Sequence, residues 1–387
     1  MERPCSEPRS VGGPTLRLRA WGRELGTIAT GAVLWGAIAG TIPDLDVLCR
    51  TFFDDLRANE LHRGVTHSIL FSLFMAPVLG HWVRWHRASL LSVFTALVGL
   101  VFVFGATTLM AKASIGIVTL VIIGLLLWRT RNADDASARE WSWLFWWSLV
   151  THPLLDCHTT WGTQLFWPLP LKVAYNNIFV VDPAYTAPFL ICVVIVLFLK
   201  RSDPKRRWIN GIGIGISTAY MVLTIVFKMM AHNAIAASLH RQGIAYSSFS
   251  TRPTPFNSIL WTTNVDCDDH YLLGYHSLLD TKPEVDFVPI PKDLELLGPW
   301  VDHGNVQRLI RLSDDNYVIQ LRNDTLMFCD LRFGQIGTPS PQKAFIYSYK
   351  LIPDGRDLRV SIVHPPPLNG KLFNGLMSEL WARVKGE

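Results

Sequence analysis

The chain has 387 residues, of which 49% are hydrophobic and only 17% are charged, and its mean hydropathy is +0.24. This composition excludes an ordinary soluble enzyme of that length and favours a membrane protein with an appended domain. The net charge of +5 does not indicate a nucleic-acid partner, because the Lys and Arg residues fall in short blocks between apolar segments and form no basic face. We therefore expect membrane lipids as the surroundings and no nucleic acid as a partner.

The apolar runs predict a mainly α-helical polytopic membrane protein with about seven spans. A basic leader over residues 1–23 precedes them. The run 89–128 has a single charge, Lys112, and as one helix would be about 60 Å long, twice the thickness of a bilayer core. We expect two spans there that turn near Lys112. The other spans are expected at about 25–42, 66–83, 141–156, 184–199 and 208–230.

The basic blocks predict the orientation of these spans. The leader and the blocks 84–87, 129–139 and 200–207 belong in the cytoplasm by the positive-inside rule. Four spans then separate His67 from His152, so both histidines are expected on the same, outer face. The prediction is a multi-pass protein whose polar clusters lie on the side away from the cytoplasm.

The tail after residue 230 differs in composition, with prolines punctuating a more polar segment. Alternating or β-branched runs predict strands, and amphipathic stretches near 293–312 and 371–384 predict helices. The strands are expected at 317–321, 326–331, 344–351 and 358–363. The predicted organisation is a leader (1–23), a transmembrane helical domain (24–230) and a C-terminal α+β extramembrane domain (231–387). Cys267 and Cys329 could form a disulfide if that domain lies outside the cytoplasm.

Three polar clusters carry the chemistry that the sequence suggests. Asp44 follows Pro43, two imidazoles flank the turn from His62 to His67, and His152 precedes Asp156 by four residues. A spacing of four places two side chains on one helical face, a usual way to offer two metal ligands. Ionisable groups at the end of an apolar span are costly unless they are paired or bound to metal.

The mixture of imidazoles and carboxylates predicts a divalent transition metal, zinc above all, and not calcium, which takes oxygen ligands alone. Each cluster also has a structural interpretation: a His–Asp hydrogen bond, an interfacial histidine or a helix cap. The predicted ligands are Asp44, His62, His67, His152 and Asp156.

Other polar residues of the clusters are expected to support the ligands. Asp46 is a candidate general base or an orienting group for a histidine or a water. Arg63 could hold an anionic group such as phosphate or carboxylate, or it could only extend to the membrane surface. The supporting residues are Thr66, Ser68, Thr159 and Thr160.

The same motifs resemble a known family. The segments Pro43–Asp46 and His62–Ser68, then 152–166 and 178–186, and finally Asp330–Gly334 are similar to those of the LexA-binding, inner-membrane-associated, YdjM-like family of membrane-bound metal-dependent hydrolases. The resemblance implies a bacterial inner-membrane protein with a hydrolase role. Trp161 stands where a tyrosine is expected, which removes no ligand.

The residues and the resemblance together predict a hydrolase in which a metal-activated water attacks an ester or phosphoester. A small-molecule or lipid-linked substrate suits a site at the bilayer surface, and the site and the C-terminal domain are expected on the periplasmic face. The first alternative is a non-catalytic protein that binds metal for transport or sensing. The second is a structural polar core with an interaction module. The oligomeric state is left open.

Overall fold

The computed structural model describes residues 32–105, 108–130, 136–200, 202–335, 337, 339–341, 343–355, 357–363 and 370–387. The chain divides into two compact units. The first unit comprises residues 1–42, 70–151 and 199–204, and the second comprises residues 43–69, 152–198 and 205–387. The domain boundaries at 23 and 230, drawn from composition, remain a prediction.

The first unit is helical. Its core consists of apolar side chains from three helices, among them Trp35, Ala76 and Phe145. A Cβ atom at Gly80 would collide with the backbone of Ser142, so a glycine is required where α3 and α5 approach. The helices are Ala32–Thr41, α3 (Ile69–Gly105, with a kink at His86), α4 (Leu109–Thr130) and α5 (Ala138–Asp156).

The prediction of about seven spans is wrong. Among the described residues, α7 (Lys205–Arg241) is the one helix long and apolar enough to cross a membrane, and the number rises to three if each of two bent helix pairs is a single span. α6 (Pro183–Phe198) has 16 residues, fewer than the roughly 20 that a bilayer core requires. The break expected near Lys112 is present a few residues earlier, since α3 ends at Gly105 and α4 begins at Leu109. The prediction that His67 and His152 share one face of the membrane depended on four spans between them, so the lower number of spans removes its basis.

The second unit begins with three short helices that lead to the polar clusters. α2 starts at the N-cap Asp54, whose carboxylate accepts from the Arg57 backbone N–H at 2.7 Å. Glu60 on α2 forms a bidentate ion pair with Arg308, at 2.8 and 2.9 Å. The short helices are η1 (Pro43–Thr51), α2 (Asp55–Leu61) and η2 (Val65–His67).

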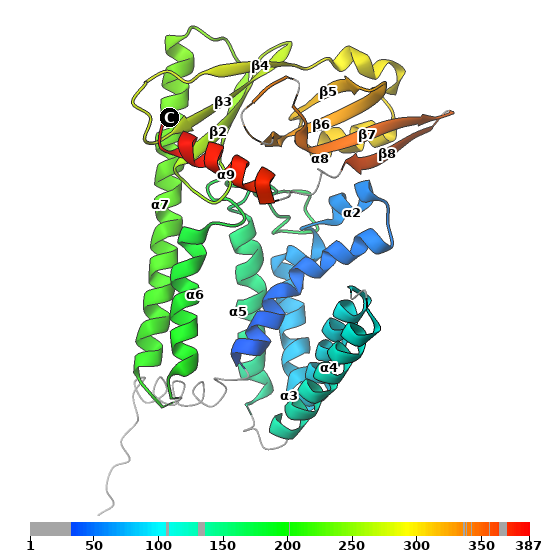
Figure 1. Cartoon of the computed structure of the whole chain (residues 1–387), viewed down its shortest axis with the longest axis vertical. Coiled ribbons are helices and arrows are strands. Elements are labelled where there is room, and N and C mark those ends of the chain that lie inside the picture. Colours follow the sequence, from blue (N-terminus) through cyan, green and yellow to red (C-terminus); the bar gives the residue numbers. More distant parts are fainter. Residues whose placement is uncertain are drawn as a thin grey trace, which may run out of the picture. The chain divides into compact units, whose positions relative to one another are not determined.

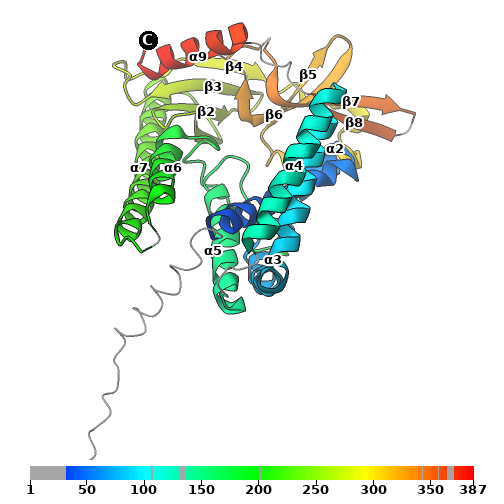
Figure 2. The same ribbon diagram turned by 60° about the horizontal axis from the view of Figure 1, so that its bottom comes forward.

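Two neighbouring helices, α6 and α7, lie side by side in this unit (Figures 1 and 2). Asp182 starts α6 by accepting from the Ala184 backbone N–H at 2.9 Å, and its second oxygen accepts from the Tyr220 hydroxyl of α7 at 3.0 Å. Asn177 donates to Thr224 of α7 at 2.7 Å. The loop between α5 and α6 is therefore fixed to α7.

The C-terminal part contains two antiparallel sheets of four strands, each in sequence order. Side chains of both sheets share one core that includes Tyr271, Ile290 and Leu331. Ile235 and Leu239 of α7 pack on the first sheet. The first sheet consists of β1 (Ser248–Pro253), β2 (Leu260–Asp266), β3 (His270–Ser277) and β4 (Phe287–Pro291). The second consists of β5 (Tyr317–Arg322), β6 (Thr325–Gln335), β7 (Phe345–Asp354) and β8 (Asp357–Val363).

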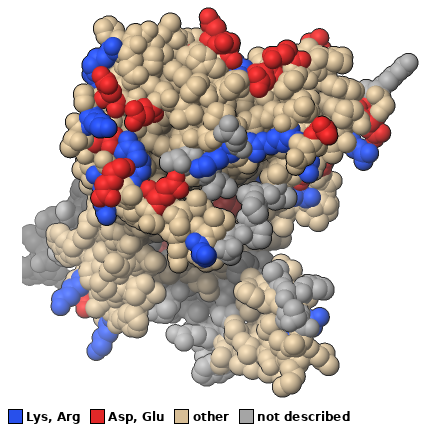
Figure 3. Space-filling view, turned by 45° about the horizontal axis from the view of Figure 1, so that its top comes forward, with Lys and Arg blue, Asp and Glu red and all other residues tan. Residues whose placement is uncertain are grey.

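Helices cover these sheets. α8 buries Val306 and Leu309 with Phe328 of the second sheet, and both views show α9 alongside the first sheet (Figures 1 and 2). The predicted strands of the second sheet and both predicted helical regions are confirmed. Cys267 and Cys329 are free thiols. Acidic and basic side chains are interspersed over this part (Figure 3). The helices are η3 (Leu294–Trp300), α8 (Gly304–Leu312) and α9 (Gly370–Val384).

Candidate metal centre

A strained turn positions the imidazole of His67. Arg63 has φ +58°, a backbone conformation that side-chain-bearing residues rarely adopt, and Gly64 follows it. The Arg63 backbone N–H donates to the Asp46 carboxylate at 2.8 Å, and its carbonyl accepts from the Gln164 N–H at 3.0 Å. These bonds hold the turn, and His67 closes η2 with its side chain fully buried.

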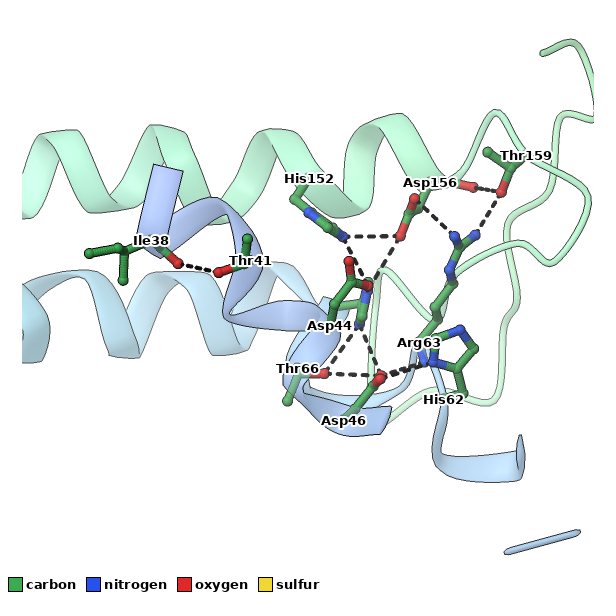
Figure 4. A network of polar contacts seen from close by, with 11 residues as sticks. Ile38, Thr41, Asp44, Asp46, His62, Arg63, Thr66, His152, Asp156 and Thr159 are labelled. Carbon is green, nitrogen blue, oxygen red and sulfur yellow. Dashed lines mark hydrogen bonds and ion pairs between the residues drawn. The ribbon is translucent and has the colours of Figure 1, made fainter. Parts of the chain in front are cut away.

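The last turn of α5 supplies two further groups. Figure 4 shows His152 and Asp156 on one helical face, both pointing toward Asp44. The Thr159 hydroxyl donates to the Asp156 carbonyl at 2.8 Å, which satisfies a carbonyl at the helix end. The spacing of four residues that the sequence suggested is therefore realised on a helix.

Four side chains converge, namely Asp44, His67, His152 and Asp156. Each offers one ligand atom, and the four atoms lie within 4.8 Å of one another. His67 Nε2 lies 3.4 Å from Asp44 Oδ1 and 3.3 Å from Asp156 Oδ2. His152 Nε2 lies 3.4 Å from each of the same two oxygens. Four of the five predicted ligands are thus brought together.

The arrangement suits an ion better than a set of hydrogen bonds. His67 Nε2, His152 Nε2 and Asp156 Oδ2 are buried and have no hydrogen-bond partner. Ligands held about 2.1 Å from a tetrahedral zinc lie about 3.4 Å apart. The observed separations of 3.3 to 3.4 Å match that spacing. The buried Asp/His cluster can therefore hold a metal ion.

Asp46 supports the cluster from outside (Figure 4). It is buried, and its Oδ2 lies 3.3 Å from His67 Nδ1, whereas His67 Nε2 is the nitrogen that faces Asp44 and Asp156. The Thr66 hydroxyl contacts both the same oxygen, at 3.4 Å, and His67 Nδ1, at 3.2 Å. The other carboxylate oxygen of Asp46, Oδ1, accepts from His62 Nδ1 at 2.9 Å. A carboxylate in this position fixes the orientation of a ligand histidine.

Arg63 bridges the cluster and the loop that follows α5. Its guanidinium lies 3.2 Å from Asp156 Oδ1 and donates to the Thr159 hydroxyl at 2.6 Å. The side chain is buried, and its Nε has no hydrogen-bond partner. The interpretation of Arg63 as an arginine that only extends to the membrane surface does not fit this environment.

The charges of the cluster shift the pKa values of its members. Burial alone would lower the pKa of His152, but the contacts with Asp156 and Asp44 outweigh burial and raise it to about 9. Burial alone would raise the pKa of Asp156, but His152, His67 and the charge of Arg63 hold it well below its usual range. Without an ion, the cluster therefore holds protons on its imidazoles at neutral pH.

The remaining predicted residues lie around the cluster. His62 is absent from the four-residue group, so its role as a ligand remains a prediction. Thr160 lines a cavity of about 320 Å³ beside the cluster, together with His62 and Arg63. The Ser68 hydroxyl donates to the Val65 carbonyl at 2.8 Å and supports η2.

No motif in the sequence indicated one wall of this cavity. Arg252 of β1 and Tyr347 of β7 line it, and neither is near a motif. Trp161 lies between the two sides, with its ring centroid 5.3 Å from that of His62 and 5.6 Å from that of Tyr347. Arg332 lies in the segment Asp330–Gly334, which carried part of the resemblance but no predicted role.

Comparison with known proteins agrees with the motifs. The family described as YdjM inner membrane protein matches residues 14–235, more than half of the chain, and this range includes all four converging side chains. Searches of curated proteins and of solved structures return no match. The chain therefore belongs to the YdjM inner membrane protein family.

Proposed function

We propose that the protein is a metal-dependent hydrolase of an ester or phosphoester, with zinc held by Asp44, His67, His152 and Asp156. The observation that carries the proposal is a group of four ligand atoms beside a cavity of about 320 Å³. Three of these atoms are buried without a hydrogen-bond partner, and the nitrogen–oxygen separations of 3.3 to 3.4 Å suit a tetrahedral zinc ion. The adjoining cavity, large enough for a small molecule, favours a hydrolase over a non-catalytic protein for transport or sensing.

The residues around the ion have distinct tasks in this proposal. A bound zinc ion would act as a Lewis acid and supply a water nucleophile near neutral pH. Asp46 orients His67, and Arg63 faces the cavity as a cation for a substrate oxygen. Hydrolysis adds one water across the ester bond, so the leaving oxygen must receive a proton. His62 is suited to give it, because Asp46 engages Nδ1 and the ring lines the cavity.

A lipid or lipid-linked substrate fits the depth of the site along α7. The helix has 37 residues, and roughly 20 are enough to cross a bilayer core. The loop between α5 and α6 contacts α7 at Tyr220 and Thr224. These two residues lie roughly one bilayer-spanning length along α7 from its first residue. We therefore place the site at the membrane surface. Five basic residues within 200–207 favour the cytoplasm for the start of α7, so we place the C-terminal sheets in the periplasm.

Metal analysis of the purified full chain tests the proposal. We expect about one zinc ion per chain after reloading, and hydrolysis of a generic phosphoester or carboxylic ester that a chelator abolishes. His152→Ala and Asp156→Asn should lose the ion and the activity together. His270→Ala is the matched control, since His270 also contacts a carboxylate, that of Asp269, at 2.6 Å. A chain that stays free of zinc and manganese would contradict the proposal.

A further inference from the structure

The cavity beside the metal centre is rich in buried positive charge. Two sides meet there: Arg63 and Thr159 come from the site, and Arg252 and Arg332 come from the strands β1 and β6. The residues that line it, all within the described part of the chain, include no Asp or Glu. Positive charges in low-dielectric walls create a positive potential inside the cavity, and this potential attracts an anion.

Arg252 is 5% exposed and makes no hydrogen bond or ion pair within the described part of the chain. The charges of Asp330 and Asp314 act on its guanidinium only from a distance. Arg332, by contrast, is neutralised by Asp330 at 2.8 Å and Asp314 at 2.6 Å. A buried guanidinium without a partner is costly, and Arg63 adds a buried Nε that is also unsatisfied. An anion in the cavity would satisfy both arginines.

A second cavity of about 270 Å³ adjoins the first. The two share six lining residues, among them Phe179, Tyr275 and Ile346. The far side of the second cavity is formed by α9, with four apolar side chains, among them Phe373 and Leu376, and the two charged side chains of Glu379 and Arg383. A single ligand could therefore place a charged end beside the metal centre and an apolar end against α9.

We propose that the substrate is a phosphorylated amphiphile, whose phosphate lies between Arg63 and Arg252 and whose hydrocarbon chain occupies the cavity beside α9. This inference rests on the proposed hydrolase function and specifies its substrate class. A phosphate fits better than a carboxylate, because its additional oxygens can accept from two guanidinium groups and still reach the metal centre. The hydrocarbon chain suits a protein of an inner-membrane family.

The reaction balances with water alone. The oxygen of one water forms a bond to phosphorus, the bond between phosphorus and the alcohol oxygen breaks, and that oxygen takes a proton. The products are inorganic phosphate and the lipid alcohol.

Three probes distinguish the phosphate from the hydrocarbon chain as the recognised feature. Each probe is presented in mixed detergent micelles to the full zinc-loaded protein. Long-chain phosphatidate has both the phosphate and the chains, glycerol phosphate lacks the chains, and long-chain diacylglycerol lacks the phosphate. We expect the highest kcat/KM for phosphatidate, with release of inorganic phosphate. Binding is measured alongside turnover, by displacement of a fluorescent phosphatidate.

Two pairs of variants test the two ends of the cavity. Arg252→Gln should raise KM for phosphatidate about 10- to 100-fold, as expected for the loss of a buried charged hydrogen bond, and Arg252→Lys should restore part of it. Arg359→Gln, an exposed arginine of β8, is the control. Leu376→Trp should fill the apolar cavity and slow phosphatidate at least ten-fold while leaving glycerol phosphate within about two-fold. Asn374→Trp, on the exposed face of α9, should change neither.

The outcomes distinguish this inference from the hydrolase proposal. Equal turnover of diacylglycerol and phosphatidate, unaffected by Arg252→Gln, would overturn the phosphorylated substrate and leave the hydrolase standing. If Leu376→Trp slowed the hydrolysis of glycerol phosphate as much as that of phosphatidate, the proposed site for the hydrocarbon chain would be overturned. Preferential, Arg252-dependent binding of phosphatidate without turnover of any probe would overturn the hydrolase and support the ligand class.

Discussion

At the scale of single residues, one carboxylate controls the orientation of the central histidine. Asp46 lies 3.3 Å from His67 Nδ1 and therefore selects the tautomer that leaves Nε2 for an ion. We expect Asp46→Asn to keep the four ligands but weaken zinc binding by about 10- to 100-fold. Competition with a fluorescent zinc chelator measures the affinity. Asp269→Asn, which alters an exposed His–Asp pair, should have no effect, and equal weakening by both would show that Asp46 has no special role.

A second residue-scale prediction concerns pH. The pKa of His152 is raised from 6.5 to about 9 in the folded chain, since Asp156 and Asp44 outweigh burial. A raised pKa stabilises the fold fully below pH 6.5, and this stabilisation is lost as pH rises through 9. The melting temperature of chelator-treated protein should therefore decrease as the pH rises from 6.5 to about 9. Zinc-loaded protein should not show this fall, because the nitrogen then holds an ion and not a proton.

The convergence of the four side chains could be predicted from the sequence because the reasons for their placement are local. His152 and Asp156 follow from helical spacing, and the turn before His67 follows from Gly64. Arg252 could not be predicted, because an arginine on a strand far along the chain becomes part of the site only through tertiary packing. His62 is intermediate, since the sequence places it beside the cluster but does not decide between Asp46 and the ion as its partner.

At the scale of elements, the loop between α5 and α6 depends on one glycine. Gly162 has φ +71°, and a Cβ atom there would lie 2.8 Å from the Ala174 Cβ and 2.9 Å from the Val173 carbonyl oxygen. The adjacent Thr163 pairs with Val173 as an isolated β-bridge. Gly162→Ala should destabilise the fold by about 1–2 kcal/mol from the left-handed conformation alone, and by more from the collision.

Thermal unfolding of the zinc-loaded chain checks this effect. Gly243→Ala is the control, since Gly243 also has a positive φ but nothing lies within 4 Å of a Cβ atom there. A similar loss in both variants would mean that strain, and not the contact with Ala174 and Val173, limits the loop.

Elements differed in how well the sequence predicted them. The strands β5 to β8 alternate or are β-branched, and all four were predicted. The first sheet was not, because β1 and β4 contain prolines and polar residues interrupt β2. The number of spans was overestimated because an apolar run does not show how long its helix will be, as α6 illustrates with only 16 residues.

At the scale of the whole molecule, our proposal that α7 crosses the membrane predicts on which side the C-terminal sheets lie. Basic residues gather at its first turn, and basic blocks favour the cytoplasm. An alkaline phosphatase fused after Glu387 should therefore be active, because this reporter folds only outside the cytoplasm. The same reporter fused after Pro204 should be inactive. The reverse pattern would invert the orientation.

The family match ends at residue 235, inside α7, whereas the cavity draws Arg252, Arg332 and Tyr347 from beyond that boundary. The side chains proposed to hold the ion and much of the surface proposed to face the substrate are thus encoded in separate stretches of the gene. Replacing the tail after residue 235 would therefore keep the proposed metal ligands and exchange the residues proposed to select the substrate.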